Sequence, residues 1–435
     1  MKKSEAIYNI IKTISPYRRM INSEGMDRAF DYVSSLLPRL EIHEFKPGAK
    51  ADDWEVPYGW ELKSAYMKNQ RGEVIASNQD SHLFVAAYSE PVHGFFQKSE
   101  IKKHLRYHQE LEHAFFMEHR NAYDYSLTDW GITLPKKVWD TMTDDEEYEI
   151  FIDVRKDTNR TMKVGELNMP GQSDATISFT AHIDELCNDN LSSCATLIQL
   201  FKDLEEQKTF RPYYTYQLLL VPETIGTYFY VHKCREKIRN TLSMINLETV
   251  GKGEKWIIKK SLNPVKYIDK IMKLSADEVL KNYEITDFFD GYGNEERIYE
   301  YPTINIPSVA IQRYPFKEYH SSEDIPENIN QSNLEKAYLF SKRVITMIEN
   351  DSIPESAHLL PPWLTKHGLY FDSMEDAKNF NIFMNQIQFN LFKGHSIVDL
   401  AYKFNVPFEK LHEYLSKFYK KKLMLKKLTH EIWKN

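Results

Sequence analysis

The stretch that decides the fold is Ile177-Ser178-Phe179-Thr180-Ala181-His182-Ile183-Asp184. A short apolar run that ends in polar residues is typical of a buried strand in an α/β sheet, and open sheets of this class bind ligands at the carboxyl ends of their strands. Alternation along the strand puts His182 and Asp184 on the same side, so Asp184 can accept one imidazole N–H while the other nitrogen faces a metal. Taken alone, such a pair is more often a plain surface hydrogen bond.

The order of elements around this strand predicts the architecture. Strand-like and helical patterns alternate in the order strand 175–181, helix 192–204, strand 216–221, helix 226–237, strand 243–247, helix 263–280, strand 308–311 and helix 333–350. This alternation predicts an α/β fold, a doubly wound sheet with parallel strands and helices on both faces.

The rest of the chain has a different texture. Residues 4–35 predict two helices, 40–45 a strand, and 51–165 a β-rich insertion with short strands such as 82–88 and 148–154. Prolines at Pro354, Pro361 and Pro362 indicate a linker before a Lys-rich module. We therefore expect three units: an α/β domain from residues 1–50 and 166–352, an inserted domain at 51–165, and a C-terminal domain at 363–435.

Composition narrows the class of protein. The 435 residues are 42% hydrophobic and carry a net charge of -7, which is typical of a folded chain and unfavourable for a general nucleic-acid binder. Three cysteines, Cys187, Cys194 and Cys234, indicate no disulfide framework and favour a reducing compartment. No signal-peptide pattern or membrane-length apolar run is present in the sequence, so we expect a cytoplasmic protein without membrane contact.

Four later junctions also place polar residues after strand-like runs or before helices. They are Asn188-Asp189-Asn190, Pro222-Glu223-Thr224, Asn246-Leu247-Glu248 and Glu318-Tyr319-His320. Each acid could instead cap a helix or complete a turn. Five junctions that each supply His, Asp or Glu are not explained by capping, whereas zinc binds imidazole nitrogen, carboxylate oxygen and a water in its open position. The pattern therefore predicts a metal-dependent hydrolase.

This order of motifs resembles the co-catalytic zinc aminopeptidase family, with its His-x-Asp strand, Asn-Asp-Asn-x-Ser turn, acid pair, Asn-Leu-Asp strand and late histidine. The resemblance covers roughly residues 170–350. More narrowly, the chain resembles bacterial aminopeptidase-like proteins linked to polysaccharide biosynthesis, in which a β-rich insertion interrupts the peptidase domain and a winged helix follows it. The supporting strings lie at residues 40–45, 53–57, 88–92, 129–131, 165–171, 222–226 and 318–322.

The resemblance implies a role for each matching residue. His182 and His320 would be zinc ligands, and Asp189 would be the carboxylate that bridges when two metals are present. Asp184 would orient His182, and Glu223 would be the general base. The resemblance also implies a zinc-aminopeptidase-like (phosphorylase/hydrolase-like) fold.

The chain departs from the family's pattern at three places. Thr224 stands where the second acid of the pair would be a metal ligand, so we expect one zinc rather than two. Glu248 replaces the shorter aspartate as a metal ligand, and Glu254 is a competing candidate. The spacing also differs at Glu185-Leu186-Cys187, where Cys187 is a soft potential ligand, although a small buried residue is the favoured interpretation.

The expected reaction is hydrolysis of an amide or peptide bond in a small peptide or an acylated amino-sugar-like substrate. In such a reaction the metal polarises the carbonyl, while Glu223 takes the proton of the water and passes it to the leaving amine. Arg313, Tyr314 and Tyr319 lie near His320 in sequence and could hold a substrate carboxylate or the oxyanion, or simply pack.

Residues 396–418 show the pattern of a helix, a turn and a second helix, and the Lys-rich run 420–427 would form the wing of a winged helix. The second helix carries Glu409 and Glu413 and no arginine. Contact with a protein partner or self-association is therefore favoured, and nucleic-acid binding is not expected.

Two other functions stay open at this point. One is a non-catalytic zinc-binding or substrate-binding protein on a degenerate aminopeptidase fold, an alternative that Thr224 keeps open. The other is a regulator that uses the winged helix, and it would produce a salt-sensitive, Lys-dependent shift of DNA.

Overall fold

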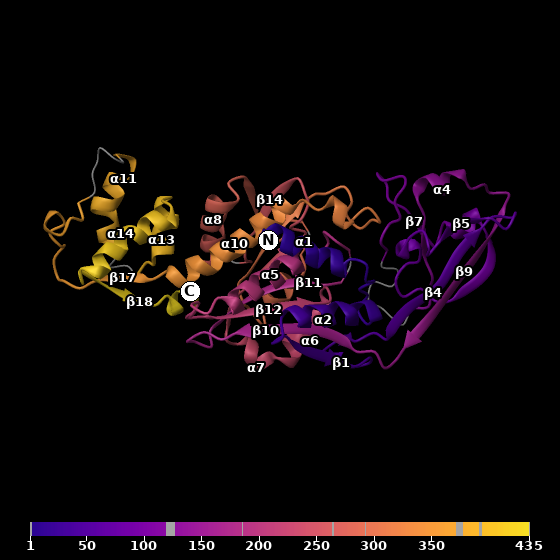
Figure 1. Cartoon of the computed structure of the whole chain (residues 1–435), viewed down its shortest axis with the longest axis horizontal. Coiled ribbons are helices and arrows are strands. Elements are labelled where there is room, and N and C mark those ends of the chain that lie inside the picture. The colour runs from indigo at the N-terminus through magenta and orange to yellow at the C-terminus, as the bar shows by residue number, and fades with distance from the viewer. Residues whose placement is uncertain are drawn as a thin grey trace.

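The computed structural model describes residues 2–118, 127–184, 186–262, 265–291, 293–370, 377–390 and 394–434. Its centre is an eight-stranded sheet with the order β1-β10-β12-β11-β13-β16-β14-β15 (Figure 1). The strands are β1 (Glu41–Phe45), β10 (Met162–Met169), β12 (Thr215–Val221), β11 (Thr176–His182), β13 (Thr241–Glu248), β16 (Ser308–Tyr314), β14 (Lys255–Lys259) and β15 (Tyr283–Thr286).

The sheet is mixed rather than wholly parallel. Strands β12, β11, β13 and β16 form the parallel centre that the sequence predicts. The pairs β1–β10, β10–β12 and β14–β16 are antiparallel, and β15 pairs parallel to β14. Only residues 249–254 separate β13 from β14. A connection this short cannot hold the crossover helix that a parallel pair needs, so the chain reverses direction. Strands β14 and β15 were not predicted.

Helices cover both faces of this sheet, as predicted. Along β12, Leu218 and Leu220 belong to one apolar core, while Leu219 and Val221 belong to a second. Because successive side chains of a strand point to opposite faces, the two cores lie on opposite sides of the sheet. The first core holds side chains from α1 (Lys3–Ile14), α2 (Glu24–Leu36), α5 (Leu191–Glu206), α8 (Tyr267–Val279) and α10 (Gln331–Asn350). The second holds side chains from α6 (Ile225–Lys233), α7 (Arg235–Ile238) and α9 (Glu295–Tyr299).

Most of the predicted helices are confirmed within a few residues. The pattern at 263–280 corresponds to α8, although residues 263 and 264 lie outside the described residues. The pattern at 226–237 is two helices, α6 and α7, and α9 was not predicted. Among the helices within the described ranges, none is both long and apolar enough to cross a membrane.

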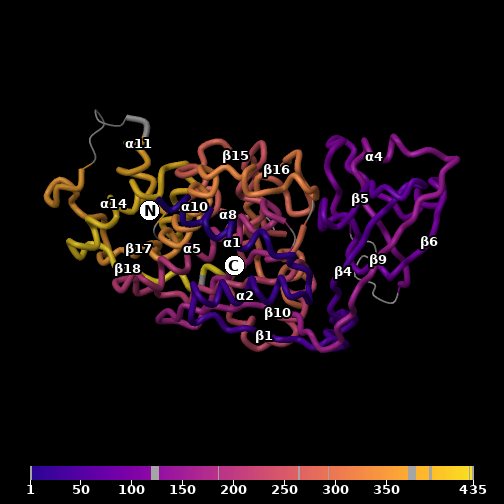
Figure 2. Tube along the Cα trace, turned by 45° about the vertical axis from the view of Figure 1, so that its right-hand side comes forward, coloured from indigo at the N-terminus to yellow at the C-terminus, as the bar shows by residue number. Residues whose placement is uncertain are grey.

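Residues between β1 and β10 form a second sheet with its own apolar core. Its order is β5-β4-β9-β6, and all of its pairs are antiparallel. The strands are β4 (Gly59–Lys68), β5 (Val74–Ser77), β6 (Val92–Gln97) and β9 (Glu147–Asp157). This part of the chain, called the insert below, stands to one side of the large sheet in Figures 1 and 2.

Shorter elements complete the insert and its junction with the large sheet. They are β2 (Lys50–Ala51), β3 (Trp54–Glu55), β7 (Leu105–Arg106), β8 (Ile132–Thr133), α3 (Lys98–Ile101) and α4 (Lys136–Thr141). The prediction of a strand at 82–88 is wrong, because His82–Phe84 forms a 3-10 turn that the side chain of Ser81 caps. The strand predicted at 148–154 lies within β9.

The C-terminal part contains the two predicted helices, α13 (Ile397–Phe404) and α14 (Phe408–Lys420), with Ser396 as the cap of α13. The preceding residues hold α11 (Ala377–Asn381) and α12 (Ile387–Asn390), and the following ones hold β18 (Met424–Lys427). Strand β18 pairs with β17 (Ile353–Ser356), so Pro354 belongs to a strand and not to a linker. Side chains of α13 and α14 share one core with α8 and α10.

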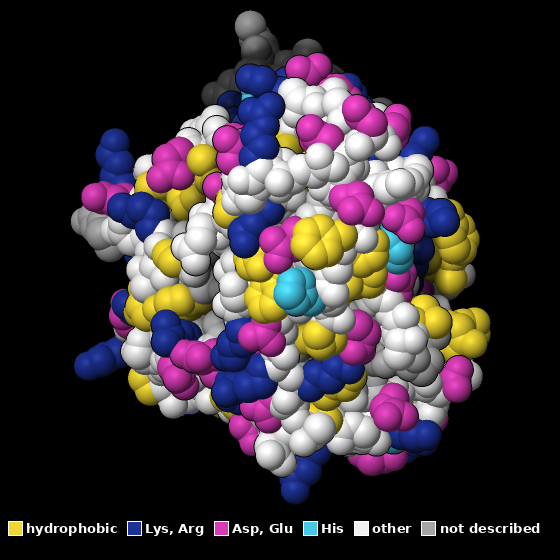
Figure 3. Space-filling view, turned by 90° about the vertical axis from the view of Figure 1, so that its right-hand side faces the viewer, with side chains coloured by type: hydrophobic (Ala, Val, Ile, Leu, Met, Phe, Trp, Pro, Cys, Tyr) yellow, Lys and Arg dark blue, Asp and Glu magenta, His cyan; other side chains and the backbone are white. Residues whose placement is uncertain are grey.

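The second of these helices, α14, is partly occupied by contacts within the chain. Arg343 of α10 lies 3.0 Å from Glu409 and its guanidinium lies over the ring of Phe408. At the other end of the molecule, basic and acidic side chains are interspersed on the outer face of the insert (Figure 3).

A buried ion cluster connects β1 and β10, at one edge of the large sheet, with α7. Glu166 of β10 is 1% exposed, and its carboxylate contacts the Nε2 atom of His43 at 2.7 Å as well as the ammonium group of Lys237. Asn168 donates a further hydrogen bond at 2.6 Å. Burial alone would raise the pKa of Glu166, but the hydrogen bonds from His43, Lys237 and Asn168 outweigh it and lower that pKa to about 2. Cys234 also lies near His43 and Glu166. The ammonium group of Lys237 already balances the buried charge of Glu166, so this group needs no metal ion to do so.

This cluster predicts a specific pH dependence of stability. Because the folded-state pKa of Glu166 lies below its usual value of 4.5, the carboxylate stabilises the fold above that pH, and its contribution is lost as the pH falls toward 2. We expect the free energy of unfolding of the wild type to decrease more steeply than that of Glu166→Gln between about pH 5 and about pH 3. Urea denaturation at several pH values measures both slopes, and equal slopes would contradict this account.

Candidate metal centre

The centre is built around His182, the last residue of β11. Its side chain is 1% exposed, and both ring nitrogens face carboxylates. Nδ1 lies 3.2 Å from Asp184, and Nε2 lies 2.9 Å from Glu248 and 3.4 Å from Asp189. Burial by itself lowers the pKa of His182, but the charges and hydrogen bonds of these three acids outweigh it and raise that pKa well above the usual value. The predicted pairing of His182 with Asp184 is confirmed.

Asp189 connects His182 to the second predicted histidine. Its carboxylate lies 3.1 Å from Nε2 of His320, whose side chain is 23% exposed and stacks on the ring of Tyr319. The peptide bond between Asp189 and Asn190 is cis. Asn190 holds this turn against the end of β13, because its amide group donates to the carbonyl of Leu247 at 2.8 Å and accepts the N–H of Thr249 at 2.9 Å.

The structure therefore brings the four predicted metal ligands together. Ligand atoms of His182, Asp189 and Glu248 all lie within 4.8 Å of one another, and His320 joins them through Asp189. These residues lie in β11, in the turn before α5, in β13 and in the loop after β16. Because β11, β13 and β16 are parallel neighbours, their carboxyl ends meet at the same edge of the sheet. Glu254, the competing candidate, is exposed, whereas Glu248 is in the cluster.

Glu223 lies beside this cluster in a strained turn. Its backbone N–H donates to Asp184 at 3.0 Å, so the carboxylate that orients His182 also fixes the position of the predicted base. The next residue, Thr224, has φ 62° and ψ −67°, and the N–H of Ile225 bonds to the carbonyl of Glu223 at 2.6 Å. This is a γ-turn, a strained form for a β-branched residue, and such strain is found mainly where function requires it.

Two residues of the centre were missed by the sequence reasoning. Glu295, on the unpredicted helix α9, is 0% exposed and accepts the N–H of Thr224 at 3.0 Å. Arg19 is 3% exposed and donates to the carbonyls of Ile183 at 2.7 Å and Leu186 at 2.6 Å. No local pattern marks Arg19 as part of the centre, because Ile183 and Leu186 lie more than 160 residues away from it in the chain.

Negative charge is concentrated at this edge of the sheet. The buried carboxylates are Asp184, Asp189, Glu248, Glu295 and Asp324. Burial raises the pKa of Glu295 to about 7 and that of Asp324 to about 7, and burial together with the charge of Asp189 also raises the pKa of Glu248, against the opposing effect of His182. Arg19 and His182 are the buried basic groups near them in the described part of the chain. Acids are held this close where a cation balances them.

The remaining candidates have contacts within the chain. Burial raises the pKa of Cys187 to about 12, and within the described residues its sulfur is not grouped with the ligand atoms of His182, Asp189 and Glu248. Glu185, which precedes it, lies outside the described residues. Arg313 bonds to the carbonyl of Gly253 and lies over the ring of Trp256, which is a packing arrangement. Tyr314 lies edge-on to Tyr319.

The insert reaches the centre as well. The N–H of Met117 donates to the carbonyl of His320 at 2.7 Å, and the N–H of Ser322 donates to the carbonyl of Phe115 at 2.9 Å. These bonds hold the loop that carries His320.

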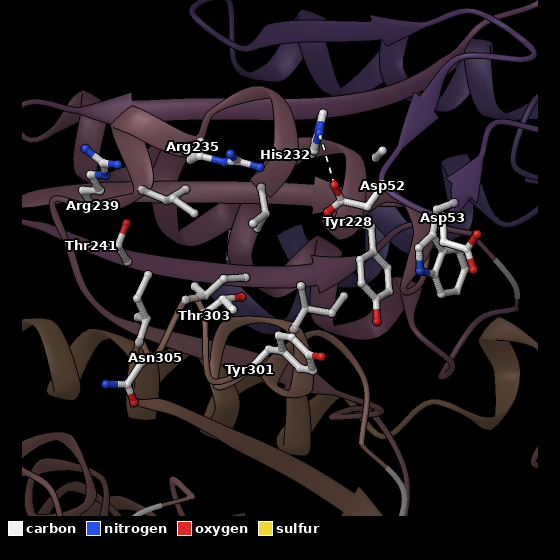
Figure 4. A pocket seen from close by; sticks show the side chains of 17 residues that line it. Asp52, Asp53, Tyr228, His232, Arg235, Arg239, Thr241, Tyr301, Thr303 and Asn305 are labelled. Carbon is white, nitrogen blue, oxygen red and sulfur yellow. Dashed lines mark ion pairs between the residues drawn. The ribbon is translucent and has the colours of Figure 1, made fainter.

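A surface cavity of about 890 Å³ lies away from this cluster, along α6 and α7 (Figure 4). Its wall includes Trp54 stacked on Tyr228, with Arg235 and Arg239 toward the opposite end. None of the predicted site residues lines it.

Comparison with known proteins places the chain in a family. The family model described as a domain of unknown function (DUF4910) matches residues 8–351. The chain belongs to this family. It is 30% identical over 429 residues to a Clostridium acetobutylicum protein that is provisionally named "polysaccharide biosynthesis protein with aminopeptidase-like domain", with 96% of this chain and 95% of that protein covered. The resemblance to such proteins is confirmed.

Solved structures show the same fold. A provisionally assigned peptidase from Clostridium acetobutylicum superimposes with a TM-score of 0.83 at 28% identity, over 98% of this chain and 97% of that one. A zinc aminopeptidase from Bacillus subtilis gives 0.59 at 14% identity over 79% and 94%. An M28 peptidase precursor from Shewanella amazonensis gives 0.59 at 12% identity over 82% and 95%. The zinc-aminopeptidase fold predicted for this chain is therefore confirmed.

The geometry around Asp184 predicts its effect on metal affinity. Asp184→Asn keeps the shape and can still accept the N–H of Glu223, but it removes the charge that favours His182 as a ligand. We expect zinc affinity to fall about 10- to 100-fold, as for other groups that orient a ligand. Competition with a chromophoric chelator measures it. Asp174→Asn, an exposed change just before the opposite end of β11, is the control, and equal affinities in both variants would contradict the assignment.

Proposed function

We propose that this chain is a zinc-dependent hydrolase of amide or peptide bonds, of the aminopeptidase type. The observation that carries the proposal is the convergence of His182, Asp189, Glu248 and His320 beside Glu223, at the edge where sheets of this class bind ligands. Asp184 acts through His182 as the orienting carboxylate.

The residues present fit zinc. Two imidazoles and two carboxylates are a donor set that this ion accepts, and the excess of buried acids over buried bases favours a bound cation. We propose a single zinc, because Thr224 offers no carboxylate where the family's pattern has a second ligand.

Bound zinc would supply Lewis acidity and lower the pKa of a water molecule. Around it, each residue has a defined task. Asp184 accepts from Nδ1 of His182 and so presents Nε2 to the cluster, and it fixes the backbone of Glu223. Glu223 takes the proton from the water and passes it to the leaving amine. The loop bonded to the insert holds His320 at Asp189.

The proposed substrate class is supported by the name of a relative. We propose a small peptide or an acylated amino-sugar-like molecule, since the family member named above is linked by its name to polysaccharide biosynthesis. We also propose the three-domain organisation given above, with all of β10 in the α/β domain and β17 joined to the C-terminal domain through β18. We further propose a winged helix at 363–435 that contacts a protein partner or a second copy, and a cytoplasmic location.

The metal assignment can be tested by the metal content of protein purified without a tag or chelator. We expect about one zinc per chain in the wild type and a loss in both His182→Ala and His320→Ala, since each removes one of four ligands. Elemental mass spectrometry measures the ratio, and His232→Ala, at an exposed position of α6, serves as the control. Absence of metal even after zinc addition would favour a non-catalytic binding protein on this fold.

The role of Glu223 calls for a separate variant. Glu223→Gln is expected to keep the zinc and to lower kcat by about 10²- to 10⁴-fold, because it removes the base and leaves the ligands. Steady-state hydrolysis of aminoacyl and acyl-amino-sugar substrates measures the change. A variant that hydrolyses them at the wild-type rate would exclude Glu223 as the base.

A further inference from the structure

We propose that Glu295 supplies a carboxylate ligand to this metal cluster, in place of the acid that the Glu223-Thr224 pair lacks. This inference rests on the proposed function, because it assumes that the cluster binds zinc. It adds a ligand from α9, a helix that no motif in the sequence marks.

The first argument is the position of the carboxylate. One oxygen of Glu295, Oε1, lies 3.0 Å from the backbone nitrogen of Thr224. Thr224 is the residue that takes the place of a ligand in the family's pattern. The carboxylate of Glu295 therefore lies beside the point in the chain where the missing acid would begin. The side chain of the preceding residue, Asn294, lies close enough to Glu248 to lower the pKa of that carboxyl, which places the start of α9 near the cluster.

The second argument is an unmet hydrogen-bonding requirement. The other oxygen of Glu295, Oε2, is buried and has no hydrogen-bond partner within the described residues. A buried carboxylate with one unsatisfied oxygen is costly unless a cation lies close to it. The charges of both His182 and Glu248 act on the carboxyl of Glu295, so Glu295 lies within electrostatic reach of the cluster and of a cation bound there.

The third argument is that α9 is held rigidly. Glu296, the next residue, forms a buried ion pair with Lys259 at 3.3 Å, and both side chains are at most 3% exposed. At the other end, Glu300 accepts the N–H groups of Ser308 at 2.8 Å and Leu262 at 3.0 Å. Because both ends of α9 are fixed, the side chain of Glu295 cannot turn to solvent and stays buried next to Thr224.

A simpler role for Glu295 would be to cap α6, because Thr224 directly precedes that helix and its N–H is the group bonded. Capping needs one acceptor oxygen and no charge. Glutamine offers that oxygen in the same shape, whereas a metal binds glutamine far less well than a carboxylate. The variant Glu295→Gln therefore separates the two roles.

The experiment measures zinc affinity by competition with a chromophoric chelator, and the melting temperature with and without zinc, for the full chain. We expect Glu295→Gln to bind zinc at least about 10-fold more weakly, with a smaller zinc-induced rise in melting temperature. The zinc-free variant should melt no lower than the zinc-free wild type, because the capping bond is kept. Glu295→Asp keeps the charge but withdraws the carboxylate, and we expect it to lose affinity as well.

Glu300→Gln is the matched control, since it changes a buried acid of the same region whose contacts are backbone N–H groups away from the cluster. It should bind zinc like the wild type. Wild-type affinity in Glu295→Gln, or an equal loss in Glu300→Gln, would overturn the proposal. If the wild type binds zinc and His182→Ala does not, then wild-type affinity in Glu295→Gln excludes Glu295 as a ligand and leaves the proposed function intact. If the wild type binds no zinc, the proposed function fails, and the ligand assignment fails with it.

Discussion

The arrangement on which the rest of the centre depends is the contact of one buried histidine with three carboxylates. His182 can hold this place only because Asp184, Asp189 and Glu248 surround it, and those acids can be buried together only if positive charge is supplied. Other features serve this balance. Arg19 binds the carbonyls after β11 from a distant part of the chain, and Asn190 ties the turn of Asp189 to β13.

The centre also shows how one side chain can serve two residues. Asp184 contacts the imidazole of His182 and the backbone of Glu223, so the orientation of a ligand and the placement of the base depend on the same carboxylate. The strained turn at Thr224 follows Glu223 directly. It leads into α6, and its N–H bonds to Glu295 of α9. A change at Asp184 is therefore expected to affect both metal binding and catalysis.

Much of this could be predicted from the sequence, for identifiable reasons. The central strands are short apolar runs between helical patterns, and each delivers its polar residue at the carboxyl end, so their convergence follows from parallel pairing. Strands β14 and β15 were missed because they are short, and Lys255–Lys259, next to the edge strand, mixes apolar and basic residues. Arg19 and Glu295 were missed because their roles depend on tertiary contacts alone. Pro354 was assigned to a linker because proline within a strand is tolerated only at an edge, which is where β17 lies.

The hydrogen bonds between the insert and the loop of His320 have a thermodynamic consequence. Met117 and Phe115 belong to a module with its own core, yet they bond to the backbone of the loop that carries a proposed zinc ligand. Ion binding and docking of the module then share one free-energy cycle: whatever docking adds to affinity for the ion, the ion adds equally to docking. The occupancy of the metal centre and the docking of the insert on the large sheet are therefore thermodynamically coupled.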